Sequence, residues 1–149
     1  MPDLSQRSKP LENYLKKRSL RAYHNMKARA NKVYVALPFT LEQFREWLRP
    51  KFGINGETRC EYSGELILVE NFSVDHRQPV ARGGSWALEN LALCSEKQNL
   101  RKGIMTKGEY AIFAAMVTTH LPHEVQQSIW RKLEIGDVQR FNYFKRQKK

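Results

Sequence analysis

A short segment in the middle of the chain combines side chains that together could hydrolyse a phosphodiester. Asp75 and His76 are adjacent, and the carboxamides of Asn90 and Asn99 follow. Hydrolysis needs a base for the attacking water, neutralisation of charge at the phosphorus and stabilisation of the leaving oxygen. A neutral imidazole such as His76 can be the base. The side-chain oxygens of Asp75 and Asn99 suit Mg²⁺ or Mn²⁺. These residue types predict one-metal nuclease chemistry.

The strand that carries Asp75 and His76 has to end there if both are to serve one site. Neighbouring side chains of a strand point to opposite faces of the sheet. Pro79 and the pair Gly83-Gly84 predict a loop directly after His76. Such a loop allows the strand to break and both side chains to reach one place.

Strands and a helix are predicted around this loop. Three short apolar runs predict strands: residues 66–69, 72–74 and 91–93. Ser95 is a good N-cap and Gly103 a good C-terminal residue for a helix between them. That helix would bring Asn99 to the strand of Asp75, with Lys102 near the same side. The predicted order is strand, loop, strand, helix.

Helices are predicted on both sides of this centre. The first 32 residues are polar, basic and compatible with a helix, whereas residues 51–57 favour a loop. Thr40 with Gln43, and Thr106 with Glu109, have the spacing of capping boxes. Gly136 is expected to end the last helix before a basic tail. We therefore expect an α+β fold in one compact unit of three parts: a basic helical extension (1–55), a nuclease core (56–105) and a C-terminal helical extension (106–149).

The composition describes one folded, basic protein. The chain has 149 residues, of which 41% are hydrophobic, and 26 Lys+Arg against 15 Asp+Glu give a net charge of +11. Such an excess favours nucleic acid or an anionic membrane surface as the partner. No run approaches the roughly 18 apolar residues that span a bilayer, and the N-terminus lacks the apolar region of a secretory signal. A cytoplasmic protein that binds DNA and no membrane is expected.

The central segment closely resembles the HNH nuclease family, which has the ββα-metal (His-Me finger) fold. The matching residues are Asp75-His76, Pro79, Gly83-Gly84, Asn90-Leu91, Leu93-Cys94, Asn99 and Lys102-Gly103. The three signature positions are His76, Asn90 and Asn99, the H-N-N variant that also occurs in the HNH domain of the CRISPR effector nuclease. The resemblance covers residues 60–103.

The resemblance implies a role for each of these residues. His76 would be the general base. Asn90 would brace the loop and orient His76. Asp75 and Asn99 would hold a Mg²⁺, or another divalent ion, that bridges the scissile phosphate and the leaving oxygen. The implied activity is endonucleolytic cleavage of DNA, leaving a 5′-phosphate and a 3′-hydroxyl. One site cuts one strand, so a double-strand break needs a homodimer or two sequential nicks. Small proteins of this kind occur among phage, homing and restriction enzymes.

The chain departs from the family at the structural zinc site. Many HNH proteins hold zinc with two Cys-x-x-Cys pairs, and here these read Cys60 to Ser63 and Cys94 to Lys97. Because Lys97 cannot bind zinc, no four-cysteine site can form and no structural zinc is expected. Cys60 and Cys94 are interpreted as remnants, expected to be neighbouring thiols, with a disulfide as the alternative.

Cations near the motif and in the N-terminal segment are candidates for DNA contacts. The N-terminal segment has nine cations against two acids, which indicates either phosphate contact or a solvated helix face. Lys102 could contact phosphate or could neutralise Asp75 in the metal-free protein. The candidates are Arg77, Arg82, Arg101 and Lys102 near the motif, and Lys16, Lys17, Arg18 and Arg21 in the N-terminal segment.

Two other functions are compatible with the sequence. The lost zinc ligands allow a non-catalytic nucleic-acid-binding module on an HNH scaffold. The basic ends also allow a structural or regulatory part in a larger nucleoprotein complex. The presence of Asp75, His76 and Asn99 together favours the enzyme.

Overall fold

The computed structural model describes the backbone of residues 11–147 and the side chains of residues 11–136, and its fold is α+β as predicted. Short 3-10 turns are present at Arg49–Lys51, Val80–Arg82 and Leu88–Asn90. The helices and strands are, in chain order, α1 (Leu11–Lys32), α2 (Leu41–Leu48), β1 (Glu57–Arg59), β2 (Leu66–Leu68), β3 (Ser73–His76), β4 (Leu91–Cys94), α3 (Glu96–Lys102), α4 (Lys107–His120) and α5 (His123–Gln147).

The strands form two separate antiparallel pairs, β1 with β2 and β3 with β4. In the second pair His76 is opposite Leu91 and Asp75 is opposite Ala92. β3, a long loop, β4 and α3 therefore follow one another in the predicted order. β1 was not predicted, because its three residues alternate too briefly to stand out from a loop. Its pairing with Leu66–Leu68 makes it a strand.

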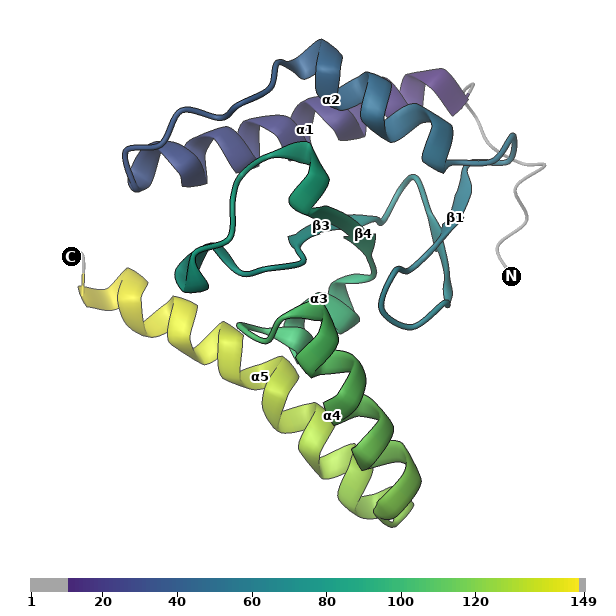
Figure 1. The fold of residues 1–149 in the computed structure, drawn as a ribbon, viewed down its shortest axis with the longest axis vertical. Helices are drawn as coiled ribbons and strands as arrows, with labels where there is room; N and C mark the ends of the chain where they lie inside the picture. The colour runs from purple at the N-terminus through teal and green to yellow at the C-terminus, as the bar shows by residue number, and fades with distance from the viewer. Residues whose placement is uncertain (1–10, 148–149) are drawn as a thin grey trace.

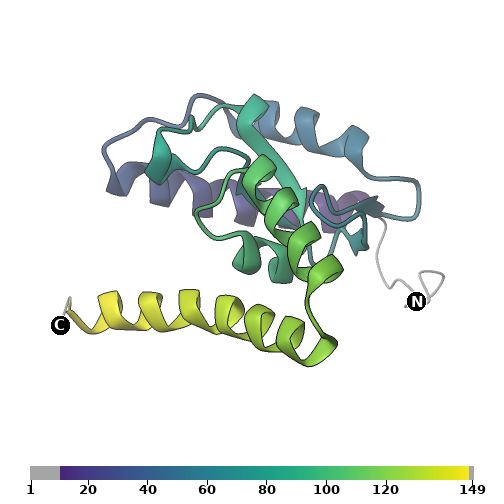
Figure 2. The same cartoon turned by 60° about the horizontal axis from the view of Figure 1, so that its bottom comes forward.

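The helices lie on opposite sides of the central strands (Figure 1). α1 and α2 run next to each other on one side of β3 and β4, while α3 and the pair α4 and α5 lie on the other. In the rotated view α5 lies apart from α1 and α2, on the far side of the molecule (Figure 2). The loop and strands that carry the signature residues are therefore enclosed between the N-terminal and C-terminal helices.

One hydrophobic core joins the N-terminal helices to the central strands. Phe44 and Leu48 of α2 are fully buried and belong to one cluster with residues of α1, β2 and β4. Burying side chains of this size stabilises the fold by about 1.5–3 kcal/mol each. Tyr110, Val117 and Trp130 form a second, smaller cluster in the C-terminal helices. The basic extension of residues 1–55 is thus packed into the core as far as the structure describes it.

The predicted helix caps are present, and one predicted helix end is wrong. Thr40 and Gln43 form a capping box at α2, and Thr106 and Glu109 form one at α4. α5 does not end at Gly136 but continues to Gln147. A glycine inside a helix costs only about 1 kcal/mol, and Gly136 does not adopt the left-handed conformation of a helix terminus. The side chains of the predicted basic tail lie outside the described residues.

In the part of the chain that the structure describes, no helix combines the length and apolar character needed to cross a membrane.

Candidate functional site

The side chain of Asn90 ties together the two ends of the long loop between β3 and β4. Its carboxamide nitrogen donates to the carbonyl oxygens of Gln78 and Ser85, at 2.9 and 2.8 Å, and its oxygen accepts from the Gln78 amide at 3.0 Å. Gly84 turns the loop so tightly that a Cβ there would overlap the Gln78 carbonyl. The loop after His76 is therefore held in one conformation by side-chain and backbone contacts together.

Asp75 points into a polar cluster formed by β3, α3 and the segment between β1 and β2. Its Oδ2 accepts a 2.6 Å hydrogen bond from the Tyr62 hydroxyl and lies 2.8 Å from Lys102 Nζ. Lys102 Nζ also donates to the His76 carbonyl oxygen at 2.9 Å. The Lys102 side chain is completely buried, whereas the Asp75 side chain is 14% exposed. Of the two roles open to Lys102, the structure shows the neutralisation of Asp75.

His76 lies on the other face of β3, beneath α1. Its ring packs edge-on against Trp86, with 4.7 Å between the ring centroids. Arg29 of α1 lies over the Trp86 ring. His76 is 5% exposed, and its Nε2 has no hydrogen-bond partner. Burial, and next the charge of Arg29, hold the pKa of His76 at about 4. The imidazole is therefore neutral at physiological pH, with one nitrogen available to accept a proton.

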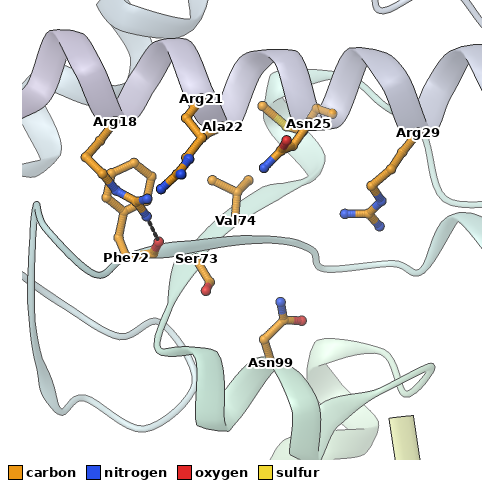
Figure 3. Close-up of a pocket in the computed structure, with 10 residues that line it drawn as sticks. Arg18, Arg21, Ala22, Asn25, Arg29, Phe72, Ser73, Val74 and Asn99 are labelled. Carbon is orange, nitrogen blue, oxygen red and sulfur yellow. Dashed lines mark hydrogen bonds between the residues drawn. The ribbon is translucent and has the colours of Figure 1, made fainter. Parts of the chain in front are cut away.

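Asn99 lines a pocket of about 190 Å³ between α1, β3 and α3. Its carboxamide points from α3 towards Ser73, Val74 and the arginines of α1 (Figure 3). Among the described residues, no hydrogen bond joins the Asn99 side chain to Asp75 or His76. Asp75 and His76 lie next to each other at the end of β3, but their side chains lie on opposite faces of the strand and do not meet in one place as expected. The structure also directs Asp75 and Asn99 into different surroundings.

The predicted metal ligands suit Mg²⁺ in chemistry but do not form a closed cage. Within residues 11–136, no group of three or more His, Cys, Asp or Glu side chains is arranged to hold a metal. The predicted set includes only one such residue, Asp75, because Asn99 contributes a carboxamide. Mg²⁺ accepts so small a protein share, since it keeps several waters and takes phosphate oxygens of the substrate. A metal at Asp75 would compete with the ammonium of Lys102.

Cys60 and Cys94 are both buried free thiols, so the predicted disulfide alternative is not formed. Burial raises the pKa of the Cys94 thiol well above its usual value. Glu65 connects the polar residues near the two cysteines: it accepts from Ser63 and Ser95, at 3.0 and 2.8 Å, and lies 4.0 Å from Lys97. Hydrogen bonds thus connect the segment that follows Cys60 with the segment that follows Cys94.

Four of the predicted DNA contacts near the motif have other partners in the structure. Arg77 forms a bidentate pair with Glu61, with both distances 2.6 Å, and Lys102 is buried beside Asp75. Arg82 pairs with Glu109, and Arg101 pairs with Glu134 at 2.9 Å. These four cations are not free for phosphate in this conformation, because each already neutralises a carboxylate.

The four predicted DNA contacts on α1 differ in where their side chains lie. Lys16 and Lys17 are exposed to solvent, whereas Arg18 and Arg21 line the pocket that contains Asn99. Arg18 also donates to the Phe72 carbonyl oxygen at 2.9 Å and lies over the Phe72 ring. The arginines, and not the lysines, of this helix therefore face the candidate site.

Three residues at the site were not predicted: Arg29, Tyr62 and Trp86. Tyr62 contacts Asp75, Trp86 packs against His76 and Arg29 lies over Trp86. They come from segments outside the strand–loop–strand–helix order or, for Trp86, from the middle of the loop. Only Trp86 had a local signal, since a large aromatic residue inside a polar loop commonly packs against something. Comparisons of the chain with family models, with curated proteins and with solved structures find no match.

Proposed function

We propose that this protein is a metal-dependent HNH DNA endonuclease built on a ββα-metal core. The observation that carries the proposal is the succession of β3, braced loop, β4 and α3, with Asp75 and His76 at the end of β3, Asn90 across the loop and Asn99 on α3. This order of elements supports the proposal because it carries the proposed base, metal ligands and loop brace on consecutive elements of the chain.

His76 is proposed as the general base. Its ring is neutral at physiological pH, and Nε2 can take a proton from the attacking water because no protein group occupies it. A pKa of about 4 makes it a weak base in the free protein. Because the ring is buried against Trp86, water and phosphate reach it only after the segment that carries Trp86 moves. DNA binding is the event expected to move this segment.

Asp75 and Asn99 are proposed to hold the divalent ion. Such an ion supplies neutralisation of charge on the scissile phosphate and on the leaving oxygen. Asp75 could bind it once Lys102 releases the carboxylate, and Asn99 could join it once its carboxamide turns from the pocket towards Asp75. Lys102 would then be available for a phosphate oxygen. Tyr62 would keep Asp75 oriented through its hydroxyl. Attack by water and departure of the 3′-oxygen leave a 5′-phosphate.

The second candidate is a nucleic-acid-binding module that does not cleave. Two observations favour it: Lys102 already neutralises Asp75, and the His76 ring is almost entirely buried. Both candidates require DNA binding, and they differ in whether the bound DNA is hydrolysed.

Supercoiled plasmid tests the proposal directly. We expect the protein to convert it to nicked or linear DNA in Mg²⁺ or Mn²⁺, and EDTA to abolish the reaction. The new ends should carry a 5′-phosphate that ligase can rejoin to the 3′-hydroxyl. Asp75→Ala should lose cleavage and keep DNA binding. If the protein binds the plasmid but leaves it intact with Mg²⁺, Mn²⁺ and Ni²⁺, the nuclease proposal is refuted and the non-cleaving nucleic-acid-binding module is supported.

A further inference from the structure

α1 carries a stripe of arginines that forms one wall of the pocket containing Asn99. Arg18, Arg21, Asn25 and Arg29 are spaced by three or four residues and lie on one face of the helix. Ser73 and Asn99 belong to the opposite wall, and the close-up shows both walls directed into the same space (Figure 3). The pocket therefore has three cations and several neutral polar groups, and no carboxylate lines it.

Five other arginines of the described residues have a carboxylate partner, which these three lack. Arg45, Arg49, Arg77, Arg82 and Arg101 each pair with a glutamate. Within residues 11–136, no ion pair neutralises Arg18, Arg21 or Arg29. The Nε atom of Arg18 is buried without a hydrogen-bond partner. Three arginines therefore share one pocket that no carboxylate lines, and this arrangement favours the binding of an anion.

The charges of the pocket repel one another in the free protein. Burial, and next the charge of Arg21, lower the pKa of Arg18 below its usual value. An anion between the side chains would remove this repulsion. The pocket volume of about 190 Å³ exceeds the share of a few water molecules, each about 30 Å³ in the liquid. There is room for a phosphate group.

We propose that this pocket binds a phosphodiester group of a nucleic-acid strand that runs along α1, with Arg21 and Arg29 contacting its phosphates and Asn25, Ser73 and Asn99 bordering it. The path of this strand rests on the proposed nuclease function, because the strand would pass Asn99 and the face of β3 that carries His76. It assigns Arg29, Asn25 and Ser73 to DNA positioning, and it separates the arginines of α1 from its lysines.

The chemistry of the stripe favours a phosphate backbone over other anions. A guanidinium offers a planar fork of donors that matches phosphate oxygens, whereas an ammonium is a point charge. From Arg18 to Arg29 the stripe extends about 16 Å, from the helical rise per residue. That length covers several consecutive phosphates of one strand. A single small anion would use only part of it.

Binding to a fluorescein-labelled DNA duplex, measured by anisotropy in EDTA, tests the pocket without cleavage. Arg21→Gln and Arg29→Gln should each weaken binding about tenfold, since each removes charged hydrogen bonds. Lys27→Gln is the matched control: it removes the same charge from the same exposed helix, about 180° away from Arg18 around the helix axis. It should weaken binding less than threefold.

The salt dependence identifies the ligand as phosphate. The double variant Arg21→Gln/Arg29→Gln should lower the slope of log Kd against log salt by about 2, because about one unit is lost per phosphate contact. Arg21→Lys/Arg29→Lys should keep most of the slope and still bind more weakly. Unchanged melting temperatures are expected, since both side chains are exposed.

Three results would overturn the pocket proposal. The first is that the arginine variants bind DNA as well as Lys27→Gln. The second is displacement of DNA by inorganic phosphate at equal phosphate concentration, which would indicate a site for a free anion. The third is arginine-dependent binding to phosphatidylglycerol vesicles without binding to DNA.

The pocket and the nuclease can fail separately. Arginine-dependent binding by a protein that never cleaves would refute the proposed function and support the pocket. Normal cleavage with arginine-independent binding would refute the pocket and support the nuclease.

Discussion

Breaking the buried ion pair between Asp75 and Lys102 should lower the stability of the protein strongly. Lys102→Met removes an ammonium whose side chain has no solvent exposure and whose Nζ lies 2.8 Å from Asp75 Oδ2. It also leaves the His76 carbonyl oxygen without that donor. Removing one partner of a buried pair costs about 3–5 kcal/mol, because the other charge stays buried and uncompensated. For a chain of this length, 3 kcal/mol lowers the melting temperature by roughly 6–12 °C.

The measurement is a double-mutant cycle at pH 7.5 in EDTA. Urea unfolding of wild type, Asp75→Asn, Lys102→Met and the double variant gives the four free energies of unfolding. Because the double variant removes both charges, it should be more stable than the sum of the single losses predicts, by at least about 2 kcal/mol. Lys107→Met is the control: its pair with Glu61, at 3.3 Å, is half-exposed and should be worth less than about 1 kcal/mol.

The same variant connects stability to the proposed metal. Mg²⁺ should stabilise Lys102→Met more than wild type, because the competing ammonium is gone and binding to the folded state raises its stability. The reasoning would be refuted by single variants that lose less than 1 kcal/mol each. Additive losses within about 0.5 kcal/mol would refute it as well, since they would show that the two charges do not interact.

Three further results are expected from urea unfolding. Gly84→Ala should lower the free energy of unfolding by at least about 2 kcal/mol, because its Cβ would overlap the Gln78 backbone. Gly108→Ala, in the first turn of α4, should leave it unchanged or raise it by up to about 1 kcal/mol. Equal stability of the two variants would contradict the loop geometry. Asn90→Ala should lose about 2–3 kcal/mol with its three hydrogen bonds, and a loss below 1 kcal/mol would show that the loop holds without them. Because the folded pKa of His76, about 4, is below its usual 6.5, the folded state resists protonation. Relative to His76→Phe, wild type should therefore be unaffected above about pH 6.5 and lose up to roughly 3 kcal/mol as the pH falls to 4. Parallel pH profiles of the two proteins would contradict the burial of the imidazole.

Local signals in the sequence were sufficient for most of the secondary structure. The capping residues Thr40, Ser95 and Thr106 each accept the expected hydrogen bond at the start of a helix. These bonds involve residues three positions apart, so spacing alone predicts them. β1 had no such signal, because a three-residue strand depends on its partner.

The directions of the site side chains depended on packing and could not be predicted. Asn99 and Lys102 are three residues apart on α3, which places them on neighbouring parts of one helix face. The sequence could not decide which of them would reach Asp75. Packing of α3 against β3 buries Lys102 and turns Asn99 to the pocket. Arg29 reaches His76 only because α1 folds over β3, which no local pattern indicates.

Cleavage of a labelled DNA duplex by His76→Ala, compared with wild type and His24→Ala under single-turnover conditions in Mg²⁺, tests the central claim most directly. His24 is an exposed residue of α1, so its loss should leave the rate within about twofold of wild type. Loss of the general base should lower the rate at least 100-fold, while DNA binding in EDTA stays unchanged. Equal rates for all three proteins, or no cleavage by wild type, would contradict the assignment of His76 as the base of a nuclease.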